Sequence, residues 1–186
     1  MERETKQSWS WKDLTRSIIW GAILIVQVLM AFLFFNSLGL IFVVYIGVAC
    51  FVVFIVMGFL AGAEFRRRGG APEGKSIIYT TKLVDTGIYS VVRHPMYTSW
   101  IFLVLALALF SQHWLSVVLG IIATVLIYLD ARKEDTNLTA KFGDTYQQYM
   151  ARVPRTNILL GLYRQLRRKP GNGASGGDWT HDQQLP

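Results

Sequence analysis

Four apolar stretches, separated by polar turns and one long charged connection, dominate the order of residues along the chain. Residues 18–35 and 38–63 contain no charged side chain, and their lengths approach or exceed the roughly 20 residues that cross a hydrocarbon core. Both stretches are therefore predicted to be membrane helices. The turn at residues 36–39 between them is short, which predicts an antiparallel hairpin.

A second pair of apolar stretches covers residues 97–110 and 115–129, and the polar turn 111–114 joins them. Each is shorter than a standard span, but together they predict a second hairpin. Trp100 and Trp114 bracket the third helix near the two interfaces, where indole rings prefer to lie. The pattern thus predicts an all-α, multi-pass membrane protein whose four transmembrane helices form two antiparallel hairpins.

The composition agrees with a membrane protein and excludes several classes of site. Of 186 residues, 52% are hydrophobic and 17% are charged. Soluble domains average about a quarter charged residues, so this deficit argues against a soluble enzyme. Cys50 is the single cysteine, which excludes an intrachain disulfide or a cysteine cluster for zinc or iron–sulfur, and we predict no metal site. The first apolar stretch is longer than the core of a signal peptide and leads into a second span, so we expect a retained helix.

The basic residues predict the orientation in the membrane. Of the 19 Lys and Arg residues, four precede residue 18, six lie within residues 64–93 and nine follow residue 129. With four crossings, all of them lie on one face, which the positive-inside rule makes cytosolic. We therefore expect cytosolic termini and a cytosolic active site. The net charge of +7 then reflects topology and attraction to anionic headgroups rather than nucleic-acid binding.

The same pattern divides the chain into three parts. Residues 1–17 are predicted to be a cytosolic N-terminal segment, and residues 18–163 an integral membrane domain. Residues 164–186 begin with basic residues and continue as a Gly-rich stretch, which predicts a disordered tail.

Residues 83–97, which lead into the third apolar stretch, contain the first group of chemically informative side chains. Pro95 suits the first position of a helix, and this places His94 at the cap, where the imidazole and the free N–H groups of the helix face the interface together. Such a helix start is suited to hold an anion or a cofactor. Taken alone, Arg93 and His94 are equally well explained as anchors that meet lipid headgroups.

The second group follows the fourth apolar stretch. If that helix continues past residue 129, Asp130 and Glu134 share one face at a spacing of four residues, which is unfavourable unless a cation lies between them. A bound sulfonium or ammonium would supply that cation, whereas the simpler alternative is a solvated helix end balanced by Arg132 and Lys133. An apolar stripe at helical spacing follows, which predicts an interfacial helix or core packing; its members are Phe142, Tyr146, Tyr149 and Val153.

Together, the two groups resemble the integral membrane methyltransferases of the isoprenylcysteine carboxyl methyltransferase and phospholipid methyltransferase group. The pattern of that group has a Leu-Val, Gly, Tyr, Val-Arg-His-Pro and Tyr segment, a hydrophobic hairpin, then Glu-Glu, Leu, Phe-Gly, Tyr, Tyr and Val-Pro-Arg. The first part is matched by Leu83, Val84, Gly87, Tyr89, Val92, Arg93, His94, Pro95 and Tyr97. The second is matched by Glu134, Leu138, Phe142, Gly143, Tyr146, Tyr149, Val153, Pro154 and Arg155. The resemblance covers residues 83–155, and two ordered motifs are more specific than either alone.

The resemblance implies S-adenosylmethionine as the methyl donor, bound at the cytosolic mouth by a C-terminal cofactor-binding segment. His94 and Tyr97 would hold the polar end of the donor, and Tyr89 would pack on its adenosine. Glu134 and Asp135 would bind its ribose or amino group. The residues implied to bind the donor are Leu83, Val84, Gly87, Tyr89, His94, Pro95, Tyr97, Glu134 and Asp135, and those implied to act in catalysis are Arg93, Asp130 and Glu134.

Three residues depart from the pattern of the group. Asp135 replaces the second Glu, and Ser99 stands where a Gly is usual. Asp130 stands where an Arg often precedes the first Glu by four residues, which puts the substrate-orienting role of that Arg in doubt. An additional carboxylate would disfavour an anionic acceptor, so Asp130 predicts a preference for a cationic or neutral amphiphile.

The implied acceptor is a membrane lipid, or a lipidated small molecule or protein. An isoprenylcysteine-type carboxylate needs no base, whereas the amine of a phospholipid such as phosphatidylethanolamine needs one, such as Asp130 or Glu134. The sequence leaves both acceptors open. An NADPH-dependent membrane reductase, similar to the sterol reductases, and a non-catalytic membrane adaptor are the alternatives; the small number of spans and the Phe-Gly, Tyr, Tyr segment favour methyl transfer.

Overall fold

A computed structural model describes residues 11–69 and 82–167. The helices in chain order are α1 (Trp11–Leu33), α2 (Ile41–Arg68), the short 3-10 helix η2 (Gly87–Ser90), α3 (Pro95–Ser111), α4 (Trp114–Arg152) and α5 (Ile158–Arg167). The described part of the chain contains no strand, which confirms the all-α prediction. Parts of the predicted N-terminal segment, of the connection after α2 and of the C-terminal tail lie outside the described residues.

Three of the helices, α1, α2 and α4, are long and apolar enough to cross a membrane. The fourth apolar helix, α3, has 17 residues and is shorter than a standard span. Large apolar side chains are exposed along the outside of the long helices, for example Phe32 at 84% and Phe59 at 73%. Exposed apolar surface of this extent is expected of an integral membrane protein, whose solvent there is lipid.

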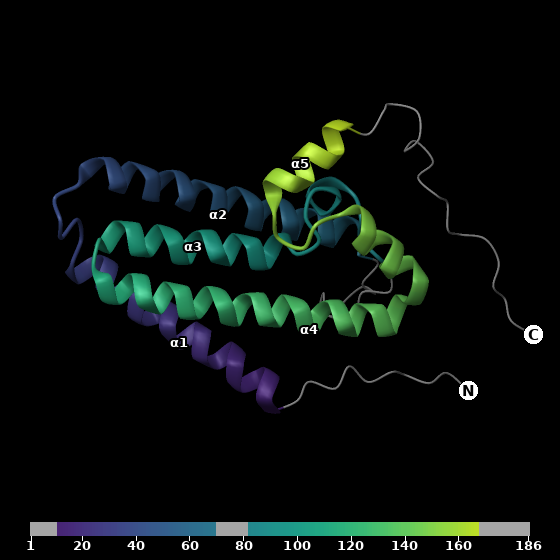
Figure 1. Cartoon of the computed structure of the whole chain (residues 1–186), viewed down its shortest axis with the longest axis horizontal. Helices are drawn as coiled ribbons and strands as arrows, with labels where there is room; N and C mark the ends of the chain where they lie inside the picture. The colour runs from purple at the N-terminus through teal and green to yellow at the C-terminus, as the bar shows by residue number, and fades with distance from the viewer. Residues whose placement is uncertain (1–10, 70–81, 168–186) are drawn as a thin grey trace, which may run out of the picture.

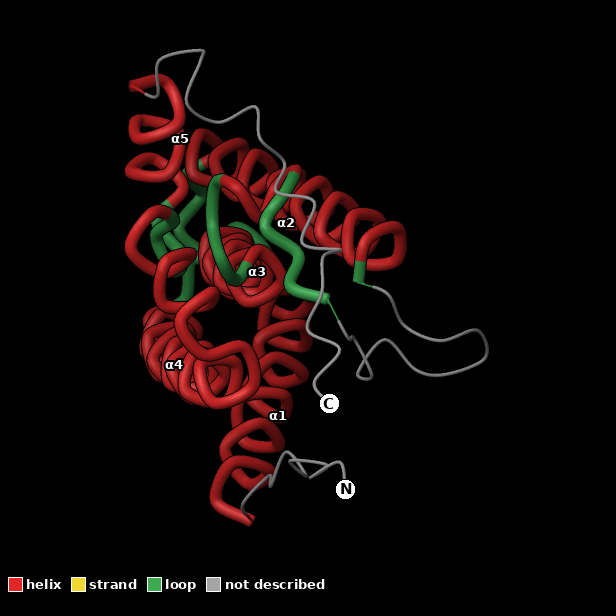
Figure 2. Tube along the Cα trace, turned by 90° about the vertical axis from the view of Figure 1, so that its right-hand side faces the viewer, coloured by secondary structure: helices red, strands yellow, loops and turns green. Residues whose placement is uncertain are grey.

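The arrangement of the helices differs from two separate hairpins. In the view along the bundle, α3 lies in the middle, with α2 on one side and α4 and α1 on the other (Figure 2). The close neighbours of α3 are thus α2, α4 and α1, while α1 packs mainly on α4 rather than on α2. Gly47 allows the close approach of α2 to α3, because a Cβ atom there would lie 2.8 Å from Cε1 of Phe110.

Hydrogen bonds between the two predicted turns fix the helices at one end of the bundle. The Ser37 hydroxyl donates to the carbonyl oxygens of Ser111 and Gln112, at 2.9 and 3.0 Å. The Gln112 amide pairs with both backbone groups of Leu40, donating to its oxygen at 2.9 Å and accepting from its nitrogen at 3.2 Å. Because side chains of the turns bond to backbone groups of the opposite turn, the start of α2 and the end of α3 lie at a common level.

At the other end, the chain after α3 returns to cover the segment before it. Helix α4 continues well past residue 129 and changes direction at Gly143, whose φ of 55° suits glycine (Figure 1). The backbone nitrogens of Arg93 and His94 then donate to the carbonyl oxygens of Pro154 and Arg155, at 3.0 and 3.1 Å. The described part of the chain ends in α5. Residues 164–167, which were expected to belong to the disordered tail, are therefore helical.

Candidate functional site

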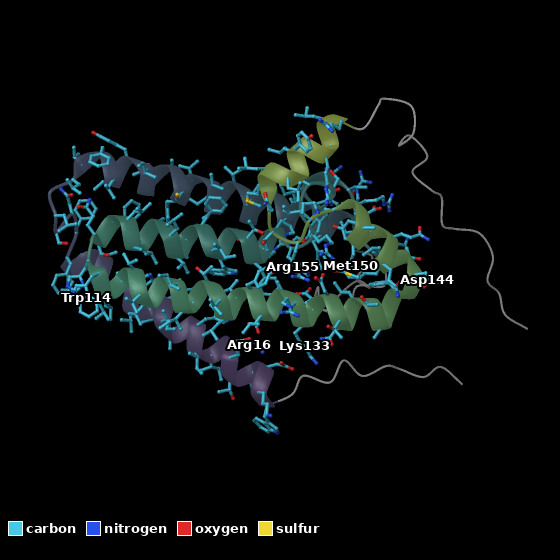
Figure 3. All side chains as sticks on the ribbon, viewed as in Figure 1. Arg16, Trp114, Lys133, Asp144, Met150 and Arg155 are labelled. Carbon is cyan, nitrogen blue, oxygen red and sulfur yellow. The ribbon has the colours of Figure 1, made fainter. Side chains whose placement is uncertain are left out.

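The two motif segments meet at the end of the bundle opposite Trp114, where Arg16 and Arg155 also lie (Figure 3). The apolar stripe of α4 is part of the core there: Tyr146, Tyr149 and Val153 are buried, and Leu83, Leu138, Phe142 and Met150 pack against them. The Tyr149 hydroxyl also donates to the carbonyl oxygen of Tyr89 at 2.6 Å. The stripe therefore holds the loop before α3 in place, as the core-packing interpretation predicted.

The carboxylate of Asp135 is the centre of the hydrogen-bond network. Its Oδ1 accepts from His94 Nε2 at 2.7 Å, from the Tyr146 hydroxyl at 2.6 Å and from Arg93 Nη1 at 3.2 Å. Its Oδ2 accepts from Arg155 Nε at 2.6 Å. The side chain is only 7% exposed, and a buried carboxylate of this kind is stable only when charged and polar donors surround it. Asp135 thus joins α4, the loop before α3 and the segment before α5.

Arg155 is a member of this network that the sequence placed in the matched motif but not in the site. Its Nη1 donates to the Tyr128 hydroxyl at 2.7 Å, and its guanidinium lies 5.2 Å from the centre of the Tyr128 ring. Burial lowers the pKa of Arg155, but the hydrogen bond and the charge of Asp135 outweigh burial and raise that pKa above its ordinary value. Arg155 therefore stays charged and keeps Asp135 paired.

His94 occupies the cap position of α3 and Pro95 its first turn, as predicted. The surroundings of the imidazole differ from those expected. The residue is 4% exposed, and its ring points toward Asp135 rather than toward the interface and the free N–H groups of the helix. Since a carboxylate can only accept, Nε2 carries the hydrogen of this bond. The other ring nitrogen, Nδ1, lies 4.0 Å from Oε2 of Glu134.

Glu134 and Tyr97 form the more open side of the site. The Glu134 side chain is 34% exposed, in contrast to its neighbour Asp135. The ring of Tyr97 contacts the imidazole of His94 edge-on, with 5.7 Å between the ring centres. The structure thus brings His94, Tyr97 and Glu134 together, and it leaves a carboxylate at the surface of the site.

Arg93 is buried beside these residues and is not fully satisfied. Its side chain is 7% exposed, and Nη1 bonds Asp135. Its Nε is buried and has no hydrogen-bond partner. Buried donors without a partner are rare in folded proteins, so this Nε is a donor that a group entering the site would satisfy.

Gly87 lies where the loop passes the end of α2. Its φ is +58°, and a Cβ atom there would lie 2.9 Å from Cδ of Glu64. The Glu64 carboxylate accepts from the Thr86 hydroxyl at 2.6 Å and from Arg68 Nε at 3.0 Å. Glu64, which the sequence did not mark as a site residue, therefore fixes the turn through Gly87.

The other predicted donor-binding residues have protein neighbours in this structure. Leu83 packs on the α4 stripe, Val84 and Tyr89 on Ala61 of α2, and Pro95 is fully buried. Burial, together with the charges of Glu134 and Glu64, raises the pKa of the Tyr89 hydroxyl, which stays protonated. These residues shape the loop, and their contact with a donor remains a prediction.

Asp130 faces α1, one turn of helix before Glu134. Its Oδ1 accepts from Arg16 Nε, and its Oδ2 accepts from Ser17 Oγ at 3.1 Å and Trp20 Nε1 at 2.8 Å. Arg16 also bonds Asp13 at 3.0 Å. The cation beside Asp130 in the structure is thus Arg16. The hypothesis that Asp130 selects the acceptor now has to include Arg16.

No cluster of three or more His, Cys, Asp or Glu side chains that could hold a metal ion occurs within residues 11–69 and 82–167. Comparison with protein-family models gives a match of residues 42–145 to the family described as phospholipid methyltransferase. The matched range includes α2, for which the sequence motifs gave no information, and ends before Tyr146. Searches of curated proteins and of solved structures gave no match.

Proposed function

Because the chain belongs to the phospholipid methyltransferase family, we propose that it transfers a methyl group from S-adenosylmethionine to the polar group of an amphiphilic membrane substrate. Membership supports a membrane methyltransferase activity in general, and methyltransferases of this family generally use S-adenosylmethionine. One observation carries the proposal: next to His94 the site offers a partly exposed carboxylate, Glu134, together with a buried donor that has no partner, Nε of Arg93.

These two groups fit the charges of S-adenosylmethionine. The donor carries a carboxylate, an ammonium and a sulfonium, so its binding site needs both a cationic and an anionic side chain. Arg93 Nε would bind the carboxylate, since guanidinium–carboxylate hydrogen bonds are strong and directional. Glu134 would accept from the ammonium or a ribose hydroxyl, with Tyr97 beside it. Asp135 has four protein donors and would act by holding Arg93 and His94 in position.

When bound, S-adenosylmethionine supplies a methyl group that leaves sulfur as the acceptor attacks in line. Most of the acceleration in such a reaction comes from alignment, which requires rigid contacts rather than a covalent catalyst. The loop before α3 has this rigidity, because Tyr149, Pro154 and Arg155 all hydrogen-bond to its backbone. A carboxylate acceptor arrives ionised, whereas an ammonium acceptor must lose a proton, for which Glu134 is the more exposed carboxylate.

The proposal includes two alternative methyl acceptors, an isoprenylcysteine-type carboxylate and a phospholipid amine. Arg16 neutralises Asp130 in the structure, which weakens the repulsion that Asp130 alone would exert on an anionic acceptor. Purified protein in nanodiscs should be assayed with both acceptors at equal mole fraction, with transfer of labelled methyl as the readout. Activity on neither, together with binding of NADPH, would support the reductase alternative instead.

The donor site can be tested by calorimetry with S-adenosylmethionine and with NADPH. We expect His94→Ala and Glu134→Gln each to weaken S-adenosylmethionine binding by about tenfold or more, the loss of one hydrogen bond to a charged group. Asp144→Asn, an exposed change on the same helix, is the control and should bind normally. The donor site is refuted if both variants fold and retain the affinity of the parent.

For the membrane arrangement, we propose that α1 to α4 all cross the bilayer and that the site faces the cytosol. The support is the absence of charge in the turns at residues 36–39 and 111–114 and the basic residues at the opposite end. With Cys50 replaced by Ala, an impermeant thiol reagent should label Leu38→Cys from outside intact cells. Labelling of Gln147→Cys should require permeabilisation, and the reverse pattern would place the site on the other side.

A further inference from the structure

Helix α5 (Ile158–Arg167) has three chemically distinct faces. At 3.6 residues per turn, Ile158, Gly161 and Gln165 share one face, Leu159, Leu162, Tyr163 and Leu166 share the next, and Arg164 and Arg167 share the third with Leu160 between them. Residues 158–167 contain no acidic side chain. The sequence of the helix therefore combines a face for packing, an apolar face and a basic face.

The first face fixes α5 to the rest of the protein. Ile158 packs against the buried cluster of Met57, Val91 and Val92. Gly161 is buried so closely that a Cβ atom there would lie 2.0 Å from the carbonyl oxygen of Val91. Gln165 Nε2 donates to the Ser90 hydroxyl at 3.2 Å. The orientation of the other two faces is therefore set by contacts with the loop before α3.

The second face points away from the protein. Leu166 is 87% exposed, Leu159 80% and Tyr163 50%. Four large apolar side chains on one face of a ten-residue helix would be unfavourable in water. A short helix with such a face beside basic residues is typical of a helix that lies in a membrane interface.

The third face carries groups that suit lipid phosphate. Arg152, Tyr163, Arg164 and Arg167 line a shallow groove along it. The guanidinium of Arg167 lies 4.6 Å from the centre of the Tyr163 ring, which joins the basic and apolar faces. Tyrosine and arginine are both enriched at the level of headgroups, where a ring lies among acyl chains and a cation meets phosphate.

The position of α5 agrees with this chemistry. The helix leaves the bundle near the end of α2 and is tilted away from the direction of the long helices (Figure 1), and it stands outside the bundle in the second view (Figure 2). In the same region, α2 changes from exposed apolar residues such as Phe59 to Arg66, Arg67 and Arg68. That change marks the expected boundary between acyl chains and headgroups.

From these observations we propose that α5 is an interfacial helix that binds the anionic lipid surface of the membrane in which the protein resides. Its leucines enter the acyl-chain boundary, and Arg164 and Arg167 bind phosphate groups. Because Pro154 and Arg155 hydrogen-bond to Arg93 and His94, this contact also fixes the height of the site relative to the headgroups.

The depth of α5 can be measured with a fluorescent label on the full chain. Nanodiscs holding one copy each would carry Leu166→Cys, or Gln147→Cys on the exposed side of α4 as the control, both with Cys50→Ala. We expect a lipid-borne quencher to act at least about twofold more strongly on the Leu166 label than on the Gln147 label, and aqueous iodide to act in the reverse order. Equal access of iodide to both labels would overturn the proposal.

Anionic lipid and a second copy of the chain are distinguished by two further comparisons. Each arginine near an anionic surface raises the affinity for that surface by a factor of about five. The double variant Arg164→Gln, Arg167→Gln should therefore lower the ratio of the affinity of the protein for phosphatidylglycerol to its affinity for phosphatidylcholine, compared in discs of each lipid, by up to about 25-fold. Arg132→Gln with Lys133→Gln removes the same charge from α4 and should keep the preference. An equal loss in both pairs contradicts anionic-lipid binding by α5. Shielding of the Leu166 label that appears only in discs with two copies would instead make this face an interface between copies.

Discussion

Replacing Arg16 with Met should destabilise the protein more than replacing its partner Asp130 with Asn. The Asp130 side chain is 2% exposed, whereas that of Arg16 is 21% exposed. Arg16→Met leaves a buried carboxylate with only the neutral donors of Ser17 and Trp20. Asp130→Asn leaves Arg16 with partial exposure to solvent and with Asp13 at 3.0 Å. Removing Arg16 therefore leaves a more deeply buried charge without its ion-pair partner than removing the charge of Asp130 does.

The expected magnitudes follow from burial. Removing one partner of a buried ion pair costs about 3–5 kcal/mol, which we expect for Arg16→Met. Asp130→Asn loses charge-assisted hydrogen bonds and should cost about 1.5–3 kcal/mol. Both variants with Arg16→Met remove the Arg16 contact of the buried Asp13, but the double variant no longer buries the Asp130 carboxylate, so it should be more stable than Arg16→Met alone, with a coupling energy of about 2 kcal/mol.

The assay is unfolding of all four proteins in mixed detergent micelles, followed by circular dichroism. Arg132→Met, at an exposed arginine on α4, is the matched control and should change stability by less than about 0.5 kcal/mol. If the effects of the two single substitutions simply add in the double variant, the ion pair does not join α1 to α4 as described.

The same variants test the role of Asp130 in acceptor choice. Asp130→Arg would place two guanidinium groups side by side, so its effect on activity would mix folding with selectivity. Asp130→Asn avoids this. An altered ratio of activities on amine and carboxylate acceptors would support a role in selection, and an unchanged ratio would leave Asp130 with a purely structural one.

Three further predictions concern other contacts. Asp135→Asn should lower the free energy of unfolding by about 3–5 kcal/mol in the same assay, because an amide cannot accept from all four donors. Tyr146→Phe removes one donor and should lower it by about 1–2 kcal/mol. Similar values for both variants would contradict the central position of Asp135. Gly161→Ala should displace α5 and speed trypsin cleavage at Arg164, whereas Gly21→Ala, with open space around its Cβ, should not. Gly87→Ala should lower the free energy of unfolding by at least about 1 kcal/mol, because Gly87 has a positive φ and lies against Glu64. Gly62→Ala, with open space around its Cβ, is the control and should be neutral. A neutral effect of Gly87→Ala as well would show that the turn adapts.

Hydrophobic patterning predicted the positions of the four apolar helices well, because each one is recognisable from its own residues, and three of them are long enough to span a membrane. Their order in space was not accessible in the same way. A lipid-facing helix and a central helix are both apolar all round, so nothing in the 17 residues of α3 distinguishes it from its neighbours. The contact of α1 with α4 includes the pair of Arg16 and Asp130, which are 114 residues apart in the chain.

The sequence identified the motif residues of the site, but it did not predict the different roles of Asp135 and Glu134. Asp135 and Glu134 are adjacent in the sequence, yet one is buried among four donors and the other is partly exposed. That difference arises from helix rotation and from donors contributed by two distant segments. Likewise, α5 is too short to be stable alone, and its packing depends on Gly161 fitting against Val91.

The difference in length between α2 and α3 has a kinetic consequence for a lipid substrate. Helix α2 begins and α3 ends at the joined turns, but α2 has 28 residues and α3 has 17, a difference of about 16 Å of helix. His94, at the cap of α3, therefore lies short of the far end of α2 along the bundle. If a lipid substrate reaches this end of the bundle from within its leaflet, its encounter rate would depend on its mole fraction in the bilayer and would fall when an inert lipid dilutes it, even when the total amount of substrate is unchanged.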